Sequence, residues 1–108
     1  MQKPEPREDP SLLGGVTTLV GTSRLRRRPD VKSRLVEGEI VILDREEELI
    51  HQLNKTASYI WEQCDGQHSA AEIASHVSEA FEVDELTALS DVLETLKALQ
   101  SLNLIENA

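Results

Sequence analysis

The stretch SRLVEGEIVILDREEELIHQL, residues 33–53, contains three short runs of strand-forming residues separated by two turns. The first turn is Glu37-Gly38, a two-residue hairpin connection in which glycine supplies a positive φ. The second turn lies in the charged run DREE. β-Branched and other apolar residues dominate the runs between the turns. The expected antiparallel strands are residues 33–36, 39–44 and 48–53.

Three helical patterns follow these strands. Asn54 can cap the first helix, and Ser69 with Glu72 forms a capping box that opens the second. The third helix is expected from near Asp84 to about Leu102. The three apolar stripes are Ala57, Ile60, Trp61 and Cys64; Ile73, Val77, Ala80 and Phe81; and Leu86, Leu89, Val92, Leu93, Leu96 and Leu99. The expected fold class is α+β: a winged-helix-like, three-stranded antiparallel sheet followed by a three-helix bundle.

Residues 1–30 differ in composition from the rest of the chain. They contain all four prolines and three of the five glycines, and they show no apolar periodicity. Such a segment buries too little apolar surface to offset its ordering entropy. We expect a disordered tail over residues 1–30 and a folded domain over residues 31–108. Within the tail, VTTLV at residues 16–20 is β-prone and could pair with a sheet edge.

The charge of the chain limits its partners. The net charge is −9, and residues 31–108 carry five Lys or Arg against sixteen Asp or Glu. An acidic domain repels phosphate backbones and anionic lipids, which argues against nucleic-acid and membrane partners. The basic run RLRRR, residues 24–28, is expected to be a solvated linker. A winged-helix DNA-binding regulator is the alternative, since three helices and a small sheet describe that fold too.

The candidate catalytic and metal-binding residues do not form a coherent site in the sequence. Cys64 lies on an apolar stripe, where a thiol is buried and inert. Together with His51, His68 and His76 it lacks the paired spacing of zinc ligands. The chain has no phosphate-binding glycine motif, and no apolar run reaches the length of a membrane span. We therefore expect no enzyme activity, no metal, no cofactor and a cytoplasmic location.

The third expected strand is the candidate binding element. In the sheet order one-two-three it lies at an edge, where its N–H and C=O groups are unpaired. Leu49, His51 and Leu53 share one face of this strand, and Ile50 and Gln52 share the other. An edge strand beside an apolar helix can accept an extended peptide as an additional strand. The alternative is an edge that is covered by the chain's own tail or left in water.

Several short motifs in this order resemble the PqqD family, the peptide chaperones of pyrroloquinoline quinone biosynthesis. They are Leu53-Asn54 before the first helix, TASYIW at 56–61, CDG at 64–66, AEI at 71–73, and a final DV..L..L...NLIE from 91 to 106. The resemblance covers about residues 26–106. The PqqD family typifies the RiPP recognition elements, which bind ribosomally made, post-translationally modified peptides.

The resemblance implies the fold described above and a non-catalytic role. Family members bind the leader of a precursor peptide as a fourth strand, in a groove between the third strand and the third helix, and present it to a radical-SAM or other modifying enzyme. Carried onto this chain, the implied peptide-binding residues are Glu48, Leu49, Ile50, His51, Gln52, Leu53, Leu89, Leu93, Leu96 and Lys97. We expect a monomer or weak dimer. The alternatives are the DNA-binding regulator and a structural subunit of another enzyme.

Overall fold

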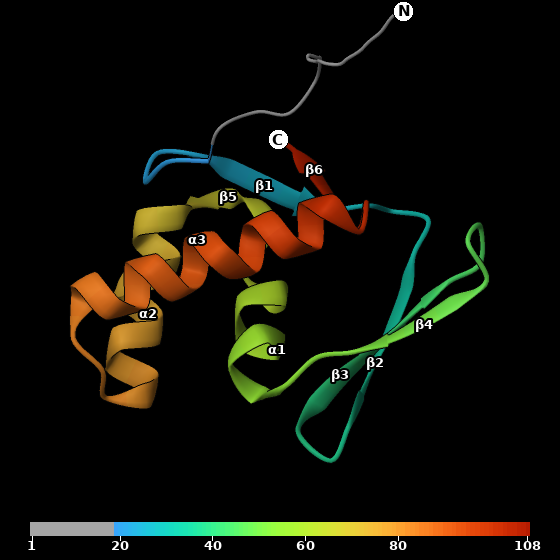
Figure 1. Ribbon diagram of the computed structural model, residues 1–108, viewed down its shortest axis with the longest axis horizontal. Coiled ribbons are helices and arrows are strands. Elements are labelled where there is room, and N and C mark those ends of the chain that lie inside the picture. The colour runs from blue at the N-terminus through green and yellow to red at the C-terminus, as the bar shows by residue number, and fades with distance from the viewer. Residues whose placement is uncertain (1–18) are drawn as a thin grey trace, which may run out of the picture.

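The computed structural model describes residues 19–108 of the chain (Figure 1). The predicted disorder of residues 1–18, and most of VTTLV, lie outside this part of the chain. The elements in chain order are β1 (Arg24–Arg27), β2 (Lys32–Val36), β3 (Glu39–Asp44), β4 (Leu49–Gln52), α1 (Lys55–Glu62), β5 (Asp65–Ser69), α2 (Ala70–Phe81), α3 (Glu85–Ser101) and β6 (Ile105–Asn107). The strands form two separate three-stranded antiparallel sheets.

The sheet β2-β3-β4, which we call the wing, confirms the three strands predicted from the sequence. Its order places β3 in the centre and leaves β2 and β4 at the edges. The turn between β2 and β3 is Glu37-Gly38, with φ of 51° and 85°. Positive φ at both turn residues matches the right-handed twist of the flanking strands, which is why this dipeptide fixes the register. Figure 1 shows the wing extending to one side of the helices.

The second sheet, β5-β1-β6, was not predicted, and it corrects the expected boundary of the tail. Residues 24–27 form its central strand rather than a solvated linker. Leu25 is 2% exposed and joins the core, while its neighbours pair with β5 on one side and β6 on the other. A single buried leucine in RLRRR is too weak a local signal for a strand, because the pairing partners lie some 40 and 80 residues further along the chain.

The arginines of β1 are held by the folded body. Arg26 Nε donates to Glu106 Oε2 at 2.8 Å. Arg27 Nη1 donates to the carbonyl oxygens of Trp61 and Glu62 at 2.9 and 2.8 Å, at the end of α1. That helix has no basic residue in its last turn, so Arg27 supplies the positive charge that its C-terminal carbonyls favour. The basic run is therefore structural.

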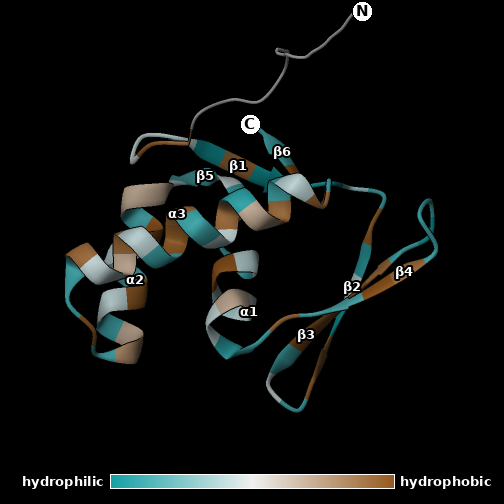
Figure 2. Cartoon of the chain, viewed as in Figure 1, coloured by the Kyte–Doolittle hydropathy of each residue, from teal (hydrophilic) through white to brown (hydrophobic). Residues whose placement is uncertain are grey.

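The helices begin at the predicted residues, the first two have the expected N-caps, and Asp84 caps the third. Asn54 accepts from the Ala57 N–H, Ser69 from the Glu72 N–H and Asp84 from the Thr87 N–H. Figure 2 shows hydrophobic and hydrophilic residues alternating along α3, as in an amphipathic helix. Two stripe predictions are wrong at their ends. Phe81 and Leu86 are 38% and 82% exposed, because α2 and α3 extend past the packed core there; Ala80 is exposed as well.

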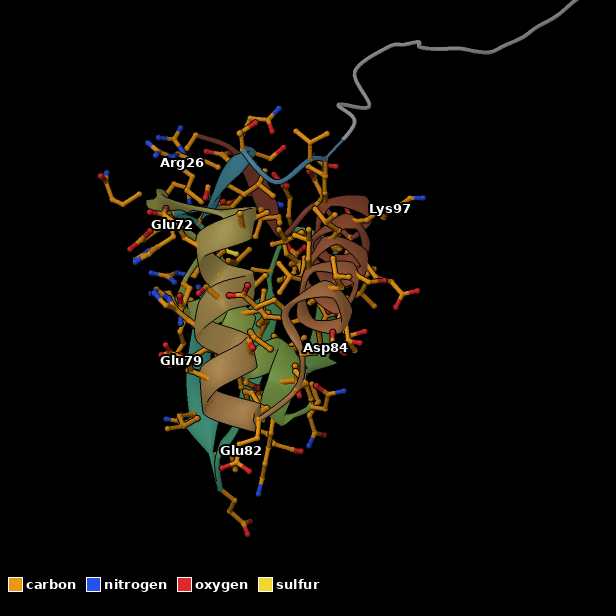
Figure 3. All side chains as sticks on the ribbon, turned by 90° about the vertical axis from the view of Figure 1, so that its left-hand side faces the viewer. Arg26, Glu72, Glu79, Glu82, Asp84 and Lys97 are labelled. Carbon is orange, nitrogen blue, oxygen red and sulfur yellow. The ribbon has the colours of Figure 1, made fainter. Side chains whose placement is uncertain are left out.

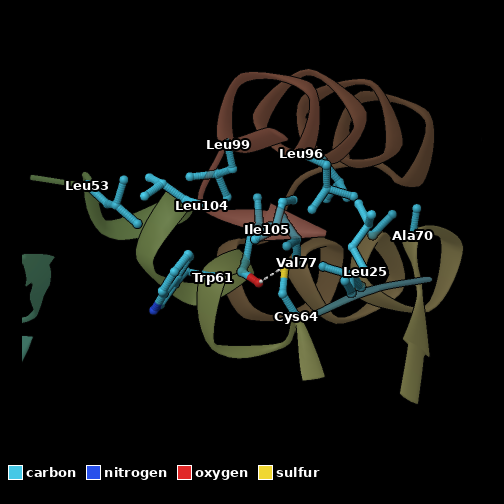
Figure 4. Close-up of a cluster of buried hydrophobic side chains, with 14 of the residues drawn as sticks. Leu25, Leu53, Trp61, Cys64, Ala70, Val77, Leu96, Leu99, Leu104 and Ile105 are labelled. Carbon is cyan, nitrogen blue, oxygen red and sulfur yellow. Dashed lines mark hydrogen bonds between the residues drawn. The ribbon is translucent and has the colours of Figure 1, made fainter. Parts of the chain in front are cut away.

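Trp61 and Cys64 lie in the core, as the apolar stripe of the first helix predicted (Figure 4). Trp61 is 2% exposed and Cys64 is fully buried between α1 and β5, where its Sγ donates to the Ile60 carbonyl at 3.3 Å. Residues from both sheets and all three helices join this cluster, including Leu25, Ile42 and Leu104. None of the helices in residues 19–108 is long and apolar enough to span a membrane.

A candidate peptide-binding edge

Strand β4 has one side that is not paired with any strand of the described chain, and we call this side the open edge. The Leu53 N–H donates to the Ile40 carbonyl at 2.8 Å, so the backbone groups of Leu53 point towards β3. In an antiparallel pair the direction of these groups alternates from residue to residue. The N–H and C=O groups of Ile50 and Gln52 therefore point outward, at the open edge.

Strand β2 has a second unpaired side, but its side chains differ from those of β4. The same alternation directs the backbone groups of Ser33 and Leu35 to the unpaired side of β2. β2 also carries Lys32 and Arg34, and charged side chains on an edge strand discourage the addition of another strand. β4 has the sequence LIHQ, which contains no Lys, Arg, Asp or Glu. Of the two edges, β4 is the one that is suited to receive a strand.

The two faces of β4 meet different surroundings. The inner face of the wing packs towards α1 and carries the buried Ile40 and Ile42, with His51 opposite Ile42. Leu53 is 9% exposed and belongs to the core (Figure 4). The outer face carries Ile50, which is 70% exposed. His51 and Leu53 therefore anchor the strand from the inner face, whereas Leu49 on that face is 49% exposed. Ile50 and the open backbone groups are available to a ligand.

Ser58 of α1 holds the end of β4 in place, a role that no pattern in the sequence indicates. The Ile40 N–H donates to Ser58 Oγ at 2.8 Å, and Ser58 Oγ donates to the Leu53 carbonyl at 3.2 Å. The buried hydroxyl therefore replaces one direct hydrogen bond of the β3–β4 ladder. It ties the strand to the first helix, so the open edge is set on a rigid support.

The turn between β3 and β4 is fixed by Asp44 and Arg28. Asp44 is 1% exposed, and its Oδ1 accepts from the N–H groups of Glu46 and Glu47. Arg28 forms ion pairs with Asp30 and, at 3.3 Å, with Glu46, and it also donates to the Asn103 carbonyl after α3. One side chain thus joins β1, the end of α3 and the base of the wing. Glu48, an expected binding residue, is the last residue of this turn and has a φ of 57°.

The expected binding residues of α3 lie in different surroundings. Leu96 is 1% exposed and belongs to the core, which corrects its expected place in a groove wall. Leu89 is half-buried and lines a shallow hollow with Ala71 and Ala74 of α2. Lys97 lines another hollow with β6 and projects away from the body (Figure 3). Leu93 is half-buried against the core. The helix packs mainly against α2, α1 and β6.

Three of the four residues that were weighed for chemistry, Cys64, His68 and His76, have hydrogen-bond partners, whereas the buried Nε2 of His51 has none among residues 19–108. Burial raises the pKa of the Cys64 thiol to about 12, so the reactive thiolate is scarce at neutral pH. His68 Nδ1 lies 3.0 Å from Asp65 Oδ1, and His76 Nδ1 lies 2.6 Å from Gln63 Oε1. In residues 19–108 no group of three or more His, Cys, Asp or Glu side chains is placed to hold a metal ion.

Comparisons with known proteins bear on the family and the fold of the chain. The family model described as coenzyme PQQ synthesis protein D (PqqD) matches residues 39–105. TbiB1 in complex with the TbiA(beta) leader peptide is 25% identical, with a TM-score of 0.69 over 75% of this chain and 94% of that chain. Lasso peptide synthetase B1 complexed with the leader peptide is 25% identical, with a TM-score of 0.70 over 78% of this chain and 99% of that one.

A third solved structure shares the fold at lower identity. It is the PqqD truncation of Methylobacterium extorquens PqqCD, described as a functional and stand-alone RiPP recognition element. It is 22% identical, with a TM-score of 0.69 over 82% of this chain and 94% of that chain. No curated protein sequence matches the chain.

Proposed function

This chain belongs to the PqqD family, and from that premise we propose that it is a non-catalytic peptide chaperone. It binds the leader of a ribosomally made precursor peptide by strand addition at the open edge of β4. It then presents the precursor to a modifying enzyme, for which a radical-SAM enzyme is our first candidate. The protein acts in the cytoplasm, where such precursors are made.

The observation that carries this proposal is the uncharged open edge itself. The N–H and C=O groups of Ile50 and Gln52 point away from β3, and the strand carries no charged side chain to repel an added one. Main-chain hydrogen bonds give such a complex affinity for almost any extended peptide, and the side-chain surroundings give it selectivity. The leader complexes of the two solved relatives that are 25% identical support this reading.

The binding surface we propose is Glu48 to Leu53. His51 and Leu53 support the strand from its inner face, and Leu49 on the same face is exposed. From α3 we keep Leu93 as a secondary candidate, since it is half-buried and retains exposed surface. Leu89 and Lys97 are weaker candidates because they line hollows against α2 and β6. The leader would thus be held mainly by the wing.

Amide chemical-shift mapping tests the proposal directly. The ¹⁵N-labelled protein is titrated with a synthetic leader peptide of the precursor encoded beside this gene, and a scrambled peptide of the same composition serves as the control. We expect the largest shifts at the amides of Ile50 and Gln52, because these N–H groups gain hydrogen bonds. Saturable binding with shifts confined to β5, β6 and α2, and none in β4, would refute the edge-binding model.

A further inference from the structure

The outer face of the wing is more apolar than folding requires. Ile40 and Ile42 of β3 point inward and are 3% and 0% exposed, whereas Val41 and Leu43 point to the opposite, outer face. An antiparallel sheet with one solvated face normally places polar residues there. Instead, Leu43 and Ile50 are 37% and 70% exposed on it. Burial in the core does not explain these residues, which suggests that they contact a ligand.

The strand register arranges the outer face in two rows that end at the open edge. The first row is Lys32, Leu43 and Ile50, and the second is Arg34, Val41 and Gln52. Five of these six residues, all but Gln52, line a shallow hollow of about 390 Å³. Lys32 and Arg34 close its far side, and neither has an ion-pair partner among residues 19–108. The near side, at Ile50, opens towards the unpaired side of β4.

An added antiparallel strand would extend both rows. The leader residues that exchange backbone hydrogen bonds with Ile50 and Gln52 lie directly opposite these two residues. Residues that lie directly opposite each other in an antiparallel pair point to the same face of the sheet. Their side chains therefore stand on the outer face, next to Ile50 and Gln52. The residue between them lies opposite His51 and points to the inner face. Every second leader residue must consequently meet the outer face.

The two rows offer different chemistry to those leader residues. A residue opposite Ile50 meets the apolar strip formed by Ile50 and Leu43. A residue opposite Gln52 meets a polar pair, since Gln52 Nε2 donates to Glu39 Oε1 at 2.9 Å. The Glu39 carboxylate makes a basic side chain the best match there. Because the leader runs antiparallel to β4, the residue opposite Gln52 comes first along the leader.

We propose that the outer face of the wing selects the leader by the pattern basic–any–large apolar, with the basic residue opposite Gln52 and the apolar residue opposite Ile50. This inference rests on the proposed function and deepens it. It assigns sequence selectivity to the face that points away from the helices. Ile50 and Leu43 select the apolar leader residue, and the Gln52–Glu39 pair selects the basic one.

The test compares two exposed apolar residues on the same face of the wing. Ile50→Ala removes the contact beside the open edge, and Val36→Ala removes a similar side chain on β2, two strands away and 42% exposed. Both variants should fold, which circular dichroism checks. Calorimetric titration with the synthetic leader should show binding weakened about ten-fold by Ile50→Ala, as expected of an apolar anchor. Val36→Ala should change the affinity less than about two-fold, as for residues outside the contact.

Substitutions in the leader provide the reciprocal test. In the wild-type protein, Asp at the apolar position or Glu at the basic position should weaken binding by about ten-fold or more. The Glu substitution should be partly rescued by Glu39→Gln, because that change removes the opposing carboxylate. A structural role for Glu39 would not produce this rescue.

The outcomes separate this inference from the proposed function. If the wild-type protein binds no leader, or binds it without shifts in β4, both fail. If the leader binds at β4 and Ile50→Ala leaves its affinity unchanged, the edge proposal stands and the outer-face inference is overturned. Sedimentation that shows self-association of the wild type, lost in Ile50→Ala while leader binding is kept, would instead assign the face to a second copy of the chain and overturn the inference.

Discussion

Cys64 shows how a side chain with reactive chemistry is made inert by its surroundings. It is fully buried between α1 and β5, and its thiol donates to the Ile60 carbonyl. Burial in apolar surroundings penalises the thiolate, and the pKa rises to about 12. The nearby Arg27 opposes this shift but does not cancel it. The protein therefore keeps a cysteine in its core without the reactivity of an exposed thiol.

We predict that Cys64 makes stability depend on pH above about 9. An unfolded thiol ionises near pH 8.5, whereas the folded thiol keeps its proton to about pH 12. Its contribution to stability is thus complete below the unfolded pKa and is lost as the pH rises through the folded pKa. Urea midpoints of the wild type should fall relative to those of Cys64→Val between pH 9 and 11. Iodoacetamide should label the native protein at pH 8 far more slowly than the urea-unfolded chain, and equal labelling rates would contradict the burial.

Individual residues differ in how well the sequence predicted them. Trp61, Ile60 and Cys64 are buried as their spacing indicated, and Asn54, Ser69 and Asp84 cap their helices. Arg27 and Arg28 were misjudged, because their partners are backbone carbonyls that are brought near only by the folded chain. No local pattern encodes a contact with a carbonyl oxygen that lies 34 or 75 residues away.

At the scale of elements, the wing was predictable and the second sheet was not. β2, β3 and β4 are consecutive, and a turn with two positive φ values joins the first two, so local chemistry defines them. β5 and β6 have the sequences DGQHS and IEN, which lack a strand pattern of their own. They are strands because β1 lies between them. Leu96 of α3 was misplaced for a related reason: a broad apolar stripe does not reveal which of its residues face the core.

We predict that proline at the open edge of β4 abolishes leader binding, whereas proline at the unpaired side of β2 does not. Gln52→Pro removes an N–H that points outward and should leave the β3–β4 hydrogen bonds in place. Ser33→Pro is the matched control, since its N–H points outward from β2. Gln52→Ala accounts for the lost side chain. Calorimetric titration with the synthetic leader checks the affinities, after circular dichroism has shown that each variant folds. Equal loss in both proline variants would mean that β4 is not the binding edge.

The whole molecule depends on a strand that lies outside the family match. The PqqD model matches residues 39–105, yet β1 supplies Leu25 to the core, its Arg26 and Arg27 hold β6 and α1, and the following Arg28 holds the base of the wing. The domain therefore begins before Val31, the boundary predicted from composition. Composition did not predict this boundary, because four arginines in five residues are typical of a solvated linker. Their hydrogen-bond partners lie far away in the sequence and come close only in the folded chain.

We predict that a chain starting at residue 19 folds like the full chain, while one starting at Val31 does not. The shorter chain loses Leu25, and removing one buried leucine side chain costs about 2–5 kcal/mol. It also loses the hydrogen bonds of β1 to β5 and β6. These losses are comparable with the total stability of a small domain, about 5–15 kcal/mol. Thermal unfolding followed by circular dichroism measures both chains, and equal midpoints would show that β1 is dispensable.

The pairing of β1 with β6 places the first and last strands of the described chain side by side. The Ala108 N–H donates to the Arg24 carbonyl at 3.0 Å, and Arg26 lies opposite Glu106. A host protein that received residues 24–108 within a surface loop would need to separate the ends of that loop by only about 5 Å. The loop-closure entropy of so narrow a gap is small. The open edge of β4 belongs to the other sheet, so an insertion through β1 and β6 would not cover the unpaired backbone groups of β4. An insertion through the β1–β6 pair would therefore leave the open edge of β4 unobstructed.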